Sequence, residues 1–335
     1  MSDLVRIENV SRRFAQRAGL ATRLAARLGA GRLPGTVHAV DGVSLTIARG
    51  EALGLVGESG CGKSTLGRIV AGVMPASEGR ATIDGAAVMG EGRRPVKTTT
   101  RVQMIFQDPF ASLDPRWRIG DAIAEGPIAH GFVTRAQARD YAQTWLAAVG
   151  LPSEAADRFP HQFSGGQRQR VAIARALAMK PDVLVCDEPV ASLDVSIQAQ
   201  IVNLFLKLRR DLSLTLLFIS HDLGVVRHVC DRVAIMYLGR IVEIGPAQAI
   251  YASPRHPYAQ ALLDSVPRLA AGEEETAFRP IAGELPSPLA PPPGCHFHLR
   301  CPFAQARCRG EIPALVADGA GRAVACHFPL RGAEP

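Results

Sequence analysis

The chain has 335 residues, of which 47% are hydrophobic and 21% are charged, enough for about two domains with a substantial buried core. No run approaches the roughly 18 uncharged apolar residues of a membrane-spanning helix, and Met1–Asn9 carries no apolar signal core, so we expect a cytoplasmic chain that meets a membrane only through partners. The net charge of +7 fits nucleic acid, a membrane surface or a nucleotide as ligand and excludes none of them.

The first part of the chain predicts two short strands, Val5–Val10 and Val43–Ile47. Between them, Ala15–Val37 carries leucines and arginines at four-residue spacing, which predicts an inserted loop with one or two helical turns. A solvated surface excursion and a contact with lipid headgroups are both open for this loop. Phe14, just before it, suits stacking on an adenine ring or packing in the core, and its position alone decides neither.

The sequence GESGCGKST follows the apolar run Ala52–Val56 and precedes the helix-forming stretch Leu66–Val73. A strand, a glycine-rich loop and a helix in this order predict a phosphate-binding loop, whose backbone N–H groups point at phosphate oxygens. Lys63 would reach the β- and γ-phosphates, and the Ser64 hydroxyl would ligate Mg²⁺. A purely structural turn is the alternative, which the lysine, the hydroxyl and the spacing disfavour. We predict a nucleoside triphosphate site built by Gly57, Glu58, Ser59, Gly60, Cys61, Gly62, Lys63, Ser64 and Thr65.

The middle of the chain predicts a hairpin at Thr82–Val88, a strand at Val102–Phe106 that ends at Gln107, and a helical subdomain over residues 108–179. Within this subdomain lies the sequence SGGQ, in which a serine suited to an N-cap and two glycines expose backbone N–H groups before a helix. It is a second anion-binding helix start, and we expect it to serve a different copy of the site. Its residues are Ser164, Gly165, Gly166 and Gln167.

Two apolar runs, Val183–Cys186 and Leu214–Ile219, predict buried parallel strands whose carboxyl ends carry polar residues. After the first, Asp187 can hold Mg²⁺ and Glu188 can polarise a water toward the γ-phosphate, although an Asp-Glu pair can also be a helix N-cap. After the second, His221 points to the same crevice, where we favour a γ-phosphate contact over a structural role. A closing hairpin follows at residues 233–244.

These motifs match a known family. In order they are GESGCGKST, Gln107 in IFQDP, FSGGQRQR, VLVCDEP, the Ser-Leu-Asp triplet that ends at Asp194, and His221. From Val5 to about Pro257 the chain resembles the nucleotide-binding subunits of ABC transporters, apart from a Phe where many members begin the signature with Leu. The resemblance implies an α/β P-loop NTPase cassette with a mixed-sheet core, an antiparallel β subdomain and a helical signature subdomain.

The same resemblance implies roles and partners. Two cassettes would form a head-to-tail dimer in which SGGQ of one covers ATP held by the other. Gln107 would sense Mg²⁺ and the transmembrane contact, Asp194 would couple the two sites, and Phe14 would stack on adenine. Glu188 would act as general base, with His221 and Gln107 beside it, and Asp187, Ser64 and Gln107 would hold Mg²⁺.

A narrower resemblance covers nearly the whole chain. The sequences QDPFASLDPRWRIGDAIAEGP, PHQFSGGQ, HPYAQALLDSVP and GCHFHLRCP look like the oligopeptide, dipeptide and nickel importer ATPases. This implies a nucleotide-binding domain at 1–255 and a small irregular extension at 256–335. It also implies ATP as substrate, two integral permease subunits, a second identical or related ATPase subunit, an indirect extracytoplasmic solute-binding protein, and a peripheral place on the cytoplasmic side of the cell membrane.

Peptides are the expected cargo, and nickel or another small solute is the alternative. A non-transport ABC ATPase acting on nucleic acid is a further alternative that the basic charge permits, but the chain has neither the heptad arrays nor the second phosphate loop usual in that class. We therefore expect no nucleic-acid partner. A simple P-loop kinase would not need SGGQ.

The seven cysteines fall into two groups. In the C-terminal segment, four of them suit Zn²⁺ or an iron–sulfur cluster, although their spacing matches neither a zinc ribbon nor a bacterial ferredoxin. We favour iron–sulfur because members of the resembled branch can carry one, with buried or free thiols as the alternative. Cys61 predicts a phosphate-loop position that needs only a small side chain, with an alkylation-sensitive thiol as the alternative because it lies near a helix start and Lys63. Cys186 and Cys230 predict core residues. The four C-terminal cysteines are Cys295, Cys301, Cys308 and Cys326.

Overall fold

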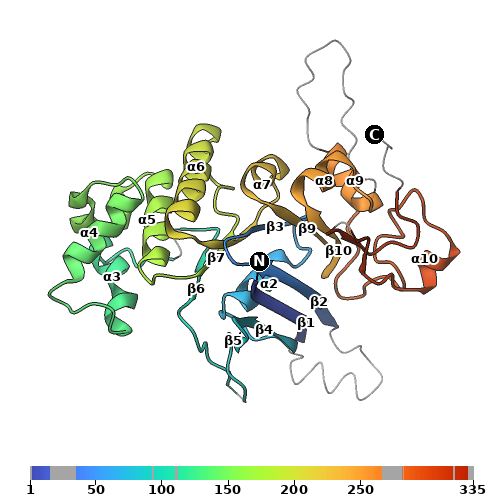
Figure 1. Cartoon of the computed structure of the whole chain (residues 1–335), viewed down its shortest axis with the longest axis horizontal. Helices are drawn as coiled ribbons and strands as arrows, with labels where there is room; N and C mark the ends of the chain where they lie inside the picture. The colour runs from blue at the N-terminus through green and yellow to red at the C-terminus, as the bar shows by residue number, and fades with distance from the viewer. Residues whose placement is uncertain are drawn as a thin grey trace, which may run out of the picture.

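The protein is described by a computed structural model that covers residues 2–15, 35–92, 94–109, 112–265, 281, 283–319 and 321–330. Two sheets form its centre, a helical subdomain lies at one end of the long axis, and the C-terminal extension lies at the other (Figure 1). The predicted inserted loop lies largely at residues 16–34, outside the described residues.

The main sheet has the strand order β11-β12-β10-β9-β3-β8-β7-β6 over the described residues. Its parallel part confirms the apolar runs identified in the sequence, because every residue of β3, β7 and β8 is buried, as expected of strands covered on both faces. The parallel strands are β3 (Ala52–Val56), β6 (Val102–Ile105), β7 (Val183–Asp187), β8 (Thr215–Ile219) and β9 (Arg232–Tyr237).

Alternating side chains of these strands enter two separate hydrophobic clusters. Leu184 and Phe218 face the cluster that includes α6 (Val195–Leu212), where Phe205 meets Phe218 edge to face at 5.8 Å between ring centroids. Val185 and Ile219 face the opposite cluster, which includes α2 (Lys63–Val70). A helix on each face fixes the register of the strands, so the polar residues that follow them emerge at one edge.

The second sheet is antiparallel, with the order β2-β1-β4-β5. The hairpin predicted at residues 82–88 is confirmed by the pairing of β4 with β5. The first two strands are longer than predicted, because cross-strand ion pairs such as Arg13–Glu78 (2.7 Å) keep polar residues within the ladder. The strands are β1 (Asp3–Ala15), β2 (Thr36–Ala48), β4 (Glu78–Ile83) and β5 (Ala86–Ala87).

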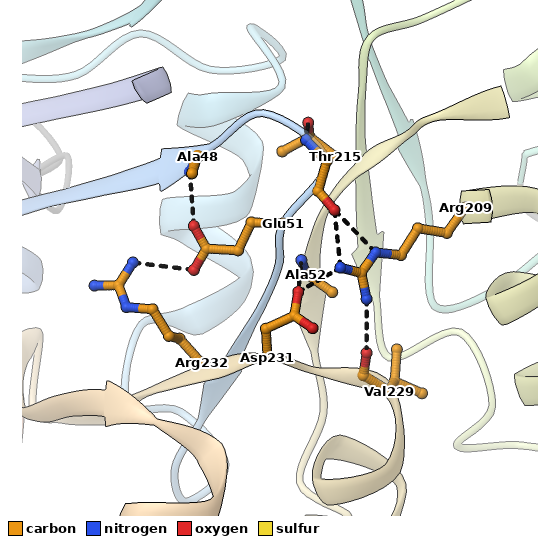
Figure 2. Close-up of polar contacts among 9 residues, drawn as sticks. Ala48, Glu51, Ala52, Arg209, Thr215, Val229, Asp231 and Arg232 are labelled. Atoms are coloured by element: carbon orange, nitrogen blue, oxygen red, sulfur yellow. Dashed lines mark hydrogen bonds and ion pairs between the residues drawn. The ribbon is translucent and has the colours of Figure 1, made fainter. Parts of the chain in front are cut away.

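A polar network anchors the start of β3, at the opposite end of the strand from the phosphate loop (Figure 2). The buried carboxylate of Glu51 accepts from the Ala48 N–H at 2.6 Å and from Arg232 at 3.0 Å. Asp231 accepts from the Ala52 N–H at 2.9 Å and from Arg209. The network ties the antiparallel sheet, the main sheet and α6 together where the loop-bearing strand begins.

Helices lie within residues 108–179, where the sequence predicts a helical subdomain. This subdomain packs against β6 at the edge of the main sheet (Figure 1). Its helices are α3 (Ile119–Ala129), α4 (Ala138–Ala148) and α5 (Gly165–Leu177), with short 3₁₀ turns at Ser153–Asp157 and Pro160–Gln162.

The C-terminal extension is tied to the main sheet. Strand β12 pairs antiparallel with β10, so the end of the chain extends the sheet that carries the phosphate loop. The fully buried Glu243 of β10 pairs with Arg322 at 2.7 Å. The predicted closing hairpin is confirmed as β9 with β10. The remaining elements are α7 (Leu223–Val229), β10 (Arg240–Pro246), α8 (Ala247–Ala252), α9 (Pro257–Asp264), α10 (Ala306–Gly310), β11 (Val316–Ala317) and β12 (Ala323–Val324).

None of the helices in the described ranges has the length and apolar composition that crossing a bilayer requires.

Candidate nucleotide site

The phosphate loop connects β3 to α2 in a conformation that only glycine tolerates at key points. Gly62 has φ +109°, and a Cβ there would lie 2.0 Å from the Ala39 carbonyl oxygen. Gly57 has φ +154°, and a Cβ there would lie 2.2 Å from the Met236 carbonyl oxygen. The loop is therefore pressed against β2 and β9, which fixes its path.

Lys63 lies folded against the loop. Its ammonium group donates to the carbonyl oxygens of Gly57 (2.8 Å) and Glu58 (2.9 Å), and the residue is 4% exposed. The positive charge is thus held inside the arch of the loop, where a phosphate group would meet it.

Ser64 and Asp187 meet although 123 positions separate them in sequence. The Ser64 hydroxyl donates to Asp187 Oδ1 at 2.8 Å. Asp187 is 2% exposed, and burial raises the pKa of its carboxyl group, partly offset by the Ser64 hydrogen bond. A hydroxyl and a carboxylate at this distance offer the hard oxygen ligands that Mg²⁺ prefers.

Side chains that follow the ends of three strands meet at Glu188. Its Oε2 accepts from Gln107 Nε2 at 3.1 Å and lies 3.3 Å from His221 Nδ1. Its φ is +48°, an uncommon conformation for a residue with a side chain, and its N–H donates to the Ile219 carbonyl at 3.0 Å. The sheet thus brings together a carboxylate, an amide and an imidazole from β7, β6 and β8, as expected from the sequence.

The SGGQ turn begins α5. The Ser164 hydroxyl accepts from the Gln167 N–H at 3.4 Å, and the Gln167 side chain accepts from the Ser164 N–H at 3.0 Å, so the predicted N-cap is confirmed as a capping box. Gly166 approaches α6, where a Cβ would lie 2.6 Å from Ile197. Within the described ranges, no hydrogen bond joins Ser164–Gln167 to the phosphate loop of the same chain.

Two other predicted ligand residues lie at the surface. Asp194 is exposed at the start of α6, beside Val195, which is 82% exposed. Phe14 is half-buried near the end of β1 with the Arg12 guanidinium 4.8 Å from its ring centroid, so it is not a core aromatic. Its adenine contact stays a prediction.

Cys61 is buried, as expected of a position that needs only a small side chain. It is 1% exposed, and burial raises the pKa of its thiol despite the neighbouring Lys63, which acts in the lowering direction. The argument for a reactive thiol is therefore wrong, because burial outweighs the nearby charge. Cys186 and Cys230 are confirmed as core residues.

The four C-terminal cysteines line one small cavity, together with His256, His298 and His327. Burial raises the pKa of Cys295, Cys301 and Cys326, the last to about 11, which favours neutral thiols. Among the residues that the structure describes, no group of three or more His, Cys, Asp or Glu side chains has an arrangement that could hold a metal ion. The iron–sulfur prediction therefore gains no support from the geometry.

Two residues that contact the phosphate loop were not identified from the sequence. The Tyr258 hydroxyl accepts from the Glu58 N–H at 2.9 Å, and Arg300 donates to the Glu58 carboxylate at 2.7 and 3.0 Å. Both lie more than 190 positions from the loop, so no local pattern marks them.

Two protein-family models match this chain. Residues 40–191 match the model of the ABC transporter family, and residues 242–308 match that of the oligopeptide/dipeptide transporter C-terminal region. The oligopeptide transport ATP-binding protein AppF of Bacillus subtilis is 44% identical over 328 residues, covering 97% of each chain. The chain belongs to the ABC transporter family of ATP-binding proteins.

Two further comparisons place it within the ABC family. The di/tripeptide transport ATP-binding protein DppF of Pseudomonas aeruginosa is 48% identical over 293 residues, covering 87% of this chain and 90% of that protein. The solved structure of CbiO1 from Clostridium perfringens, part of the ABC transporter complex CbiONQ, is 27% identical with a TM-score of 0.59, and covers 75% of this chain and 92% of its own. The ABC cassette fold predicted from the motifs is therefore confirmed.

Proposed function

We propose that this ABC protein is the ATP-hydrolysing subunit of an importer that carries peptides across the cytoplasmic membrane. The observation that carries the proposal is the convergence of Gln107, Glu188 and His221 beside the Ser64–Asp187 pair, on a chain that matches AppF over 97% of both lengths. AppF and DppF are named for oligopeptide and di/tripeptide transport, which favours peptides over nickel as cargo.

The proposed roles follow from the contacts. Lys63 leaves the loop carbonyls to bind the β- and γ-phosphates, and Ser64, Asp187 and Gln107 supply oxygen ligands for Mg²⁺, which neutralises charge on the transferring phosphoryl group when bound. Glu188 accepts the proton of the attacking water, and His221 and Gln107 hold its carboxylate in place. The resemblance to ABC transporter subunits, rather than a contact, assigns Phe14 to stacking on adenine.

The site is completed by a second ATPase subunit, identical or related. The exposed Ser164, together with Gly165, Gly166 and Gln167, has no hydrogen bond to its own phosphate loop within the described residues, which supports a role toward ATP held by a partner. Val195 is an exposed hydrophobic side chain beside Asp194, and apolar surface of this kind supports burial in a subunit interface. Asp194 would couple the two sites across that interface.

Two permease subunits dock beside the site, and an extracytoplasmic solute-binding protein acts through them. A cavity of about 790 Å³ lies between β6 and the helical subdomain, with Gln103, His130 and Arg175 in its lining. Its position next to Gln107 supports a contact that reports permease movement to the γ-phosphate. The subunit then lies peripherally on the cytoplasmic face of the membrane, with residues 1–255 as the nucleotide-binding domain and 256–335 as the extension.

The four cysteines are the proposed site of an iron–sulfur cluster or Zn²⁺, on condition that their side chains rearrange. All four line one small cavity, but no group of three or more His, Cys, Asp or Glu side chains among the described residues has the arrangement of a metal site. Protein purified without oxygen should show visible absorbance and bound iron; colourless, metal-free and fully active protein would end the proposal.

The function is tested in vesicles that contain the ATPase with the permease subunits encoded beside it. ATP-dependent uptake of a labelled peptide is the expected result. Uptake of nickel but not peptide would change the cargo, and salt-sensitive nucleic-acid binding without copurifying membrane subunits would support the alternative function.

A further inference from the structure

The C-terminal extension contacts the phosphate loop through an ion pair as well as through the Tyr258 hydroxyl. Arg300 donates two hydrogen bonds to the Glu58 carboxylate, Nη1 to Oε2 at 2.7 Å and Nη2 to Oε1 at 3.0 Å. The Arg300 side chain is 4% exposed and that of Glu58 is 26% exposed. A two-pronged arginine–carboxylate contact that excludes most water is both directional and strong, so it fixes where the Glu58 carboxylate points.

The surroundings of the pair are rigid. Tyr237 packs edge to face against Tyr258 and Phe297, whose own rings are tilted at 55° to each other. The ring centroids are 4.6 to 5.3 Å apart, and all three residues are at most 1% exposed. Arg300 Nη1 also lies 3.5 Å from the Tyr237 hydroxyl. The extension therefore holds Arg300 on a packed base that it shares with the main sheet.

Glu58 is held on three sides. Its carboxylate binds Arg300, its N–H binds the Tyr258 hydroxyl, and its carbonyl accepts from Lys63. Glu58 is thus one of the two loop residues whose carbonyl groups accept from Lys63, and it is also the loop residue that the extension contacts.

The negative charge of Glu58 makes its contact with Arg300 relevant to the binding of the triphosphate. A free carboxylate in a phosphate loop repels the triphosphate and competes for Lys63, whereas a carboxylate neutralised and turned toward Arg300 does neither. Burial and the Glu58 hydrogen bonds act in opposite directions on the pKa of Arg300, and the net effect raises it, so the cation persists at any physiological pH.

We propose that Arg300 is a positioning residue for ATP binding: by neutralising Glu58, the C-terminal extension sets the affinity of the phosphate loop for the triphosphate. The proposal rests on the nucleotide site assigned above. A merely structural Arg300 would anchor the extension without changing affinity in a way that depends on the Glu58 charge.

The experiment uses the full-length chain and measures the dissociation constant for ATP by calorimetry, together with KM and kcat. Arg300→Gln should weaken ATP binding about tenfold and raise KM, with kcat changed little. The double variant Arg300→Gln/Glu58→Gln, which removes the unpaired charge, should recover most of the affinity. Arg300→Lys, which keeps the charge without the fork, should fall between wild type and Arg300→Gln.

Arg307→Gln is the matched control, because it breaks the exposed Arg307–Glu311 pair in the same extension. It should bind ATP as wild type does. Equal affinity in Arg300→Gln and wild type, or a double variant as weak as Arg300→Gln, would overturn the inference. If Arg300→Gln does not fold, Arg300→Lys is compared with the wild type instead. An ATP affinity of Arg300→Lys equal to that of the wild type would count against the proposal. Failure of the wild type itself to bind ATP would instead refute the proposed function.

Discussion

At the scale of single residues, the proposed catalytic groups converge on Glu188. One carboxylate oxygen meets both Gln107 and His221, and Glu188 follows β7 with a positive φ of +48°. The fold holds groups from three strand ends within hydrogen-bond distance of one another, and catalysis benefits from such preorganisation.

Replacing this carboxylate should separate binding from hydrolysis. Glu188→Gln keeps the size and the hydrogen-bond partners but cannot take a proton, so steady-state ATPase activity should fall about 10²- to 10⁴-fold while ATP still binds. Phosphate release measures the first effect and calorimetry the second. Glu311→Gln, at an exposed position in the extension, is the control. Near-normal turnover in Glu188→Gln would contradict the general-base role.

Lys63 should act on binding instead. Lys63→Ala removes the ammonium group that lies inside the loop, so ATP affinity should fall at least about tenfold. Lys207→Ala, on the exposed side of α6, serves as control and should leave the affinity unchanged. Calorimetry again decides, and an unaltered ATP affinity in Lys63→Ala would show that the lysine does not contact phosphate.

The sequence located these residues because motif spacing and strand ends are local signals. It could not locate Arg300 or Tyr258, whose contacts with Glu58 depend on how distant segments pack. It also left a reactive thiol open as the alternative for Cys61, because proximity to Lys63 is visible in the sequence but burial, which dominates the thiol pKa, is not.

At the scale of elements, β3 is held at its start by the network around Glu51 (Figure 2). Glu51→Ala leaves the Ala48 N–H and Arg232 without their acceptor. Because the carboxylate is only 6% exposed, this should destabilise the fold by about 2–4 kcal/mol. Urea unfolding measures the effect as a lower midpoint.

Glu8→Ala is the comparison, because the Glu8–Arg80 pair is largely exposed and should contribute less than about 1 kcal/mol. If the two variants unfold at the same urea concentration, the buried anchor does not stabilise the strand as argued.

The histidine that caps helix α9 should make the folding stability depend on pH. His256 caps it by accepting from the Tyr258 N–H at 3.0 Å, which requires a neutral ring, and burial lowers its pKa to about 3 from an ordinary 6.5. The unfolded chain takes up this proton first, so the stabilisation is complete above about pH 6.5 and is lost as the pH falls toward 3.

Relative to neutral pH, this group should cost about 2 kcal/mol of folding stability at pH 5. His256→Asn keeps a capping acceptor without a titrating ring, so its stability should fall less between pH 7 and pH 5. Urea midpoints at both pH values test this, with His161→Asn, at an exposed site, as control. Identical pH dependence in wild type and His256→Asn would exclude the buried histidine as a cause.

At the scale of the whole molecule, the helical subdomain and the C-terminal extension lie at opposite ends of the main sheet, and the phosphate loop lies between them (Figure 1). The order of motifs predicted the cassette and its helical subdomain. It did not predict that the extension joins the main sheet, because β11 and β12 have two residues each and leave no periodic pattern. The buried Glu243–Arg322 pair was equally hidden, since 79 positions separate its members.

The central claim is that ATP is enclosed only when two cassettes meet. The most direct test places a photo-crosslinking residue at position 164 of the Glu188→Gln variant, co-expressed with its neighbouring transporter subunits and trapped with ATP. The account predicts an ATP-dependent crosslink from this position to the phosphate loop of the second cassette. A crosslink confined to the same chain, or none at all while ATP is bound, would contradict it.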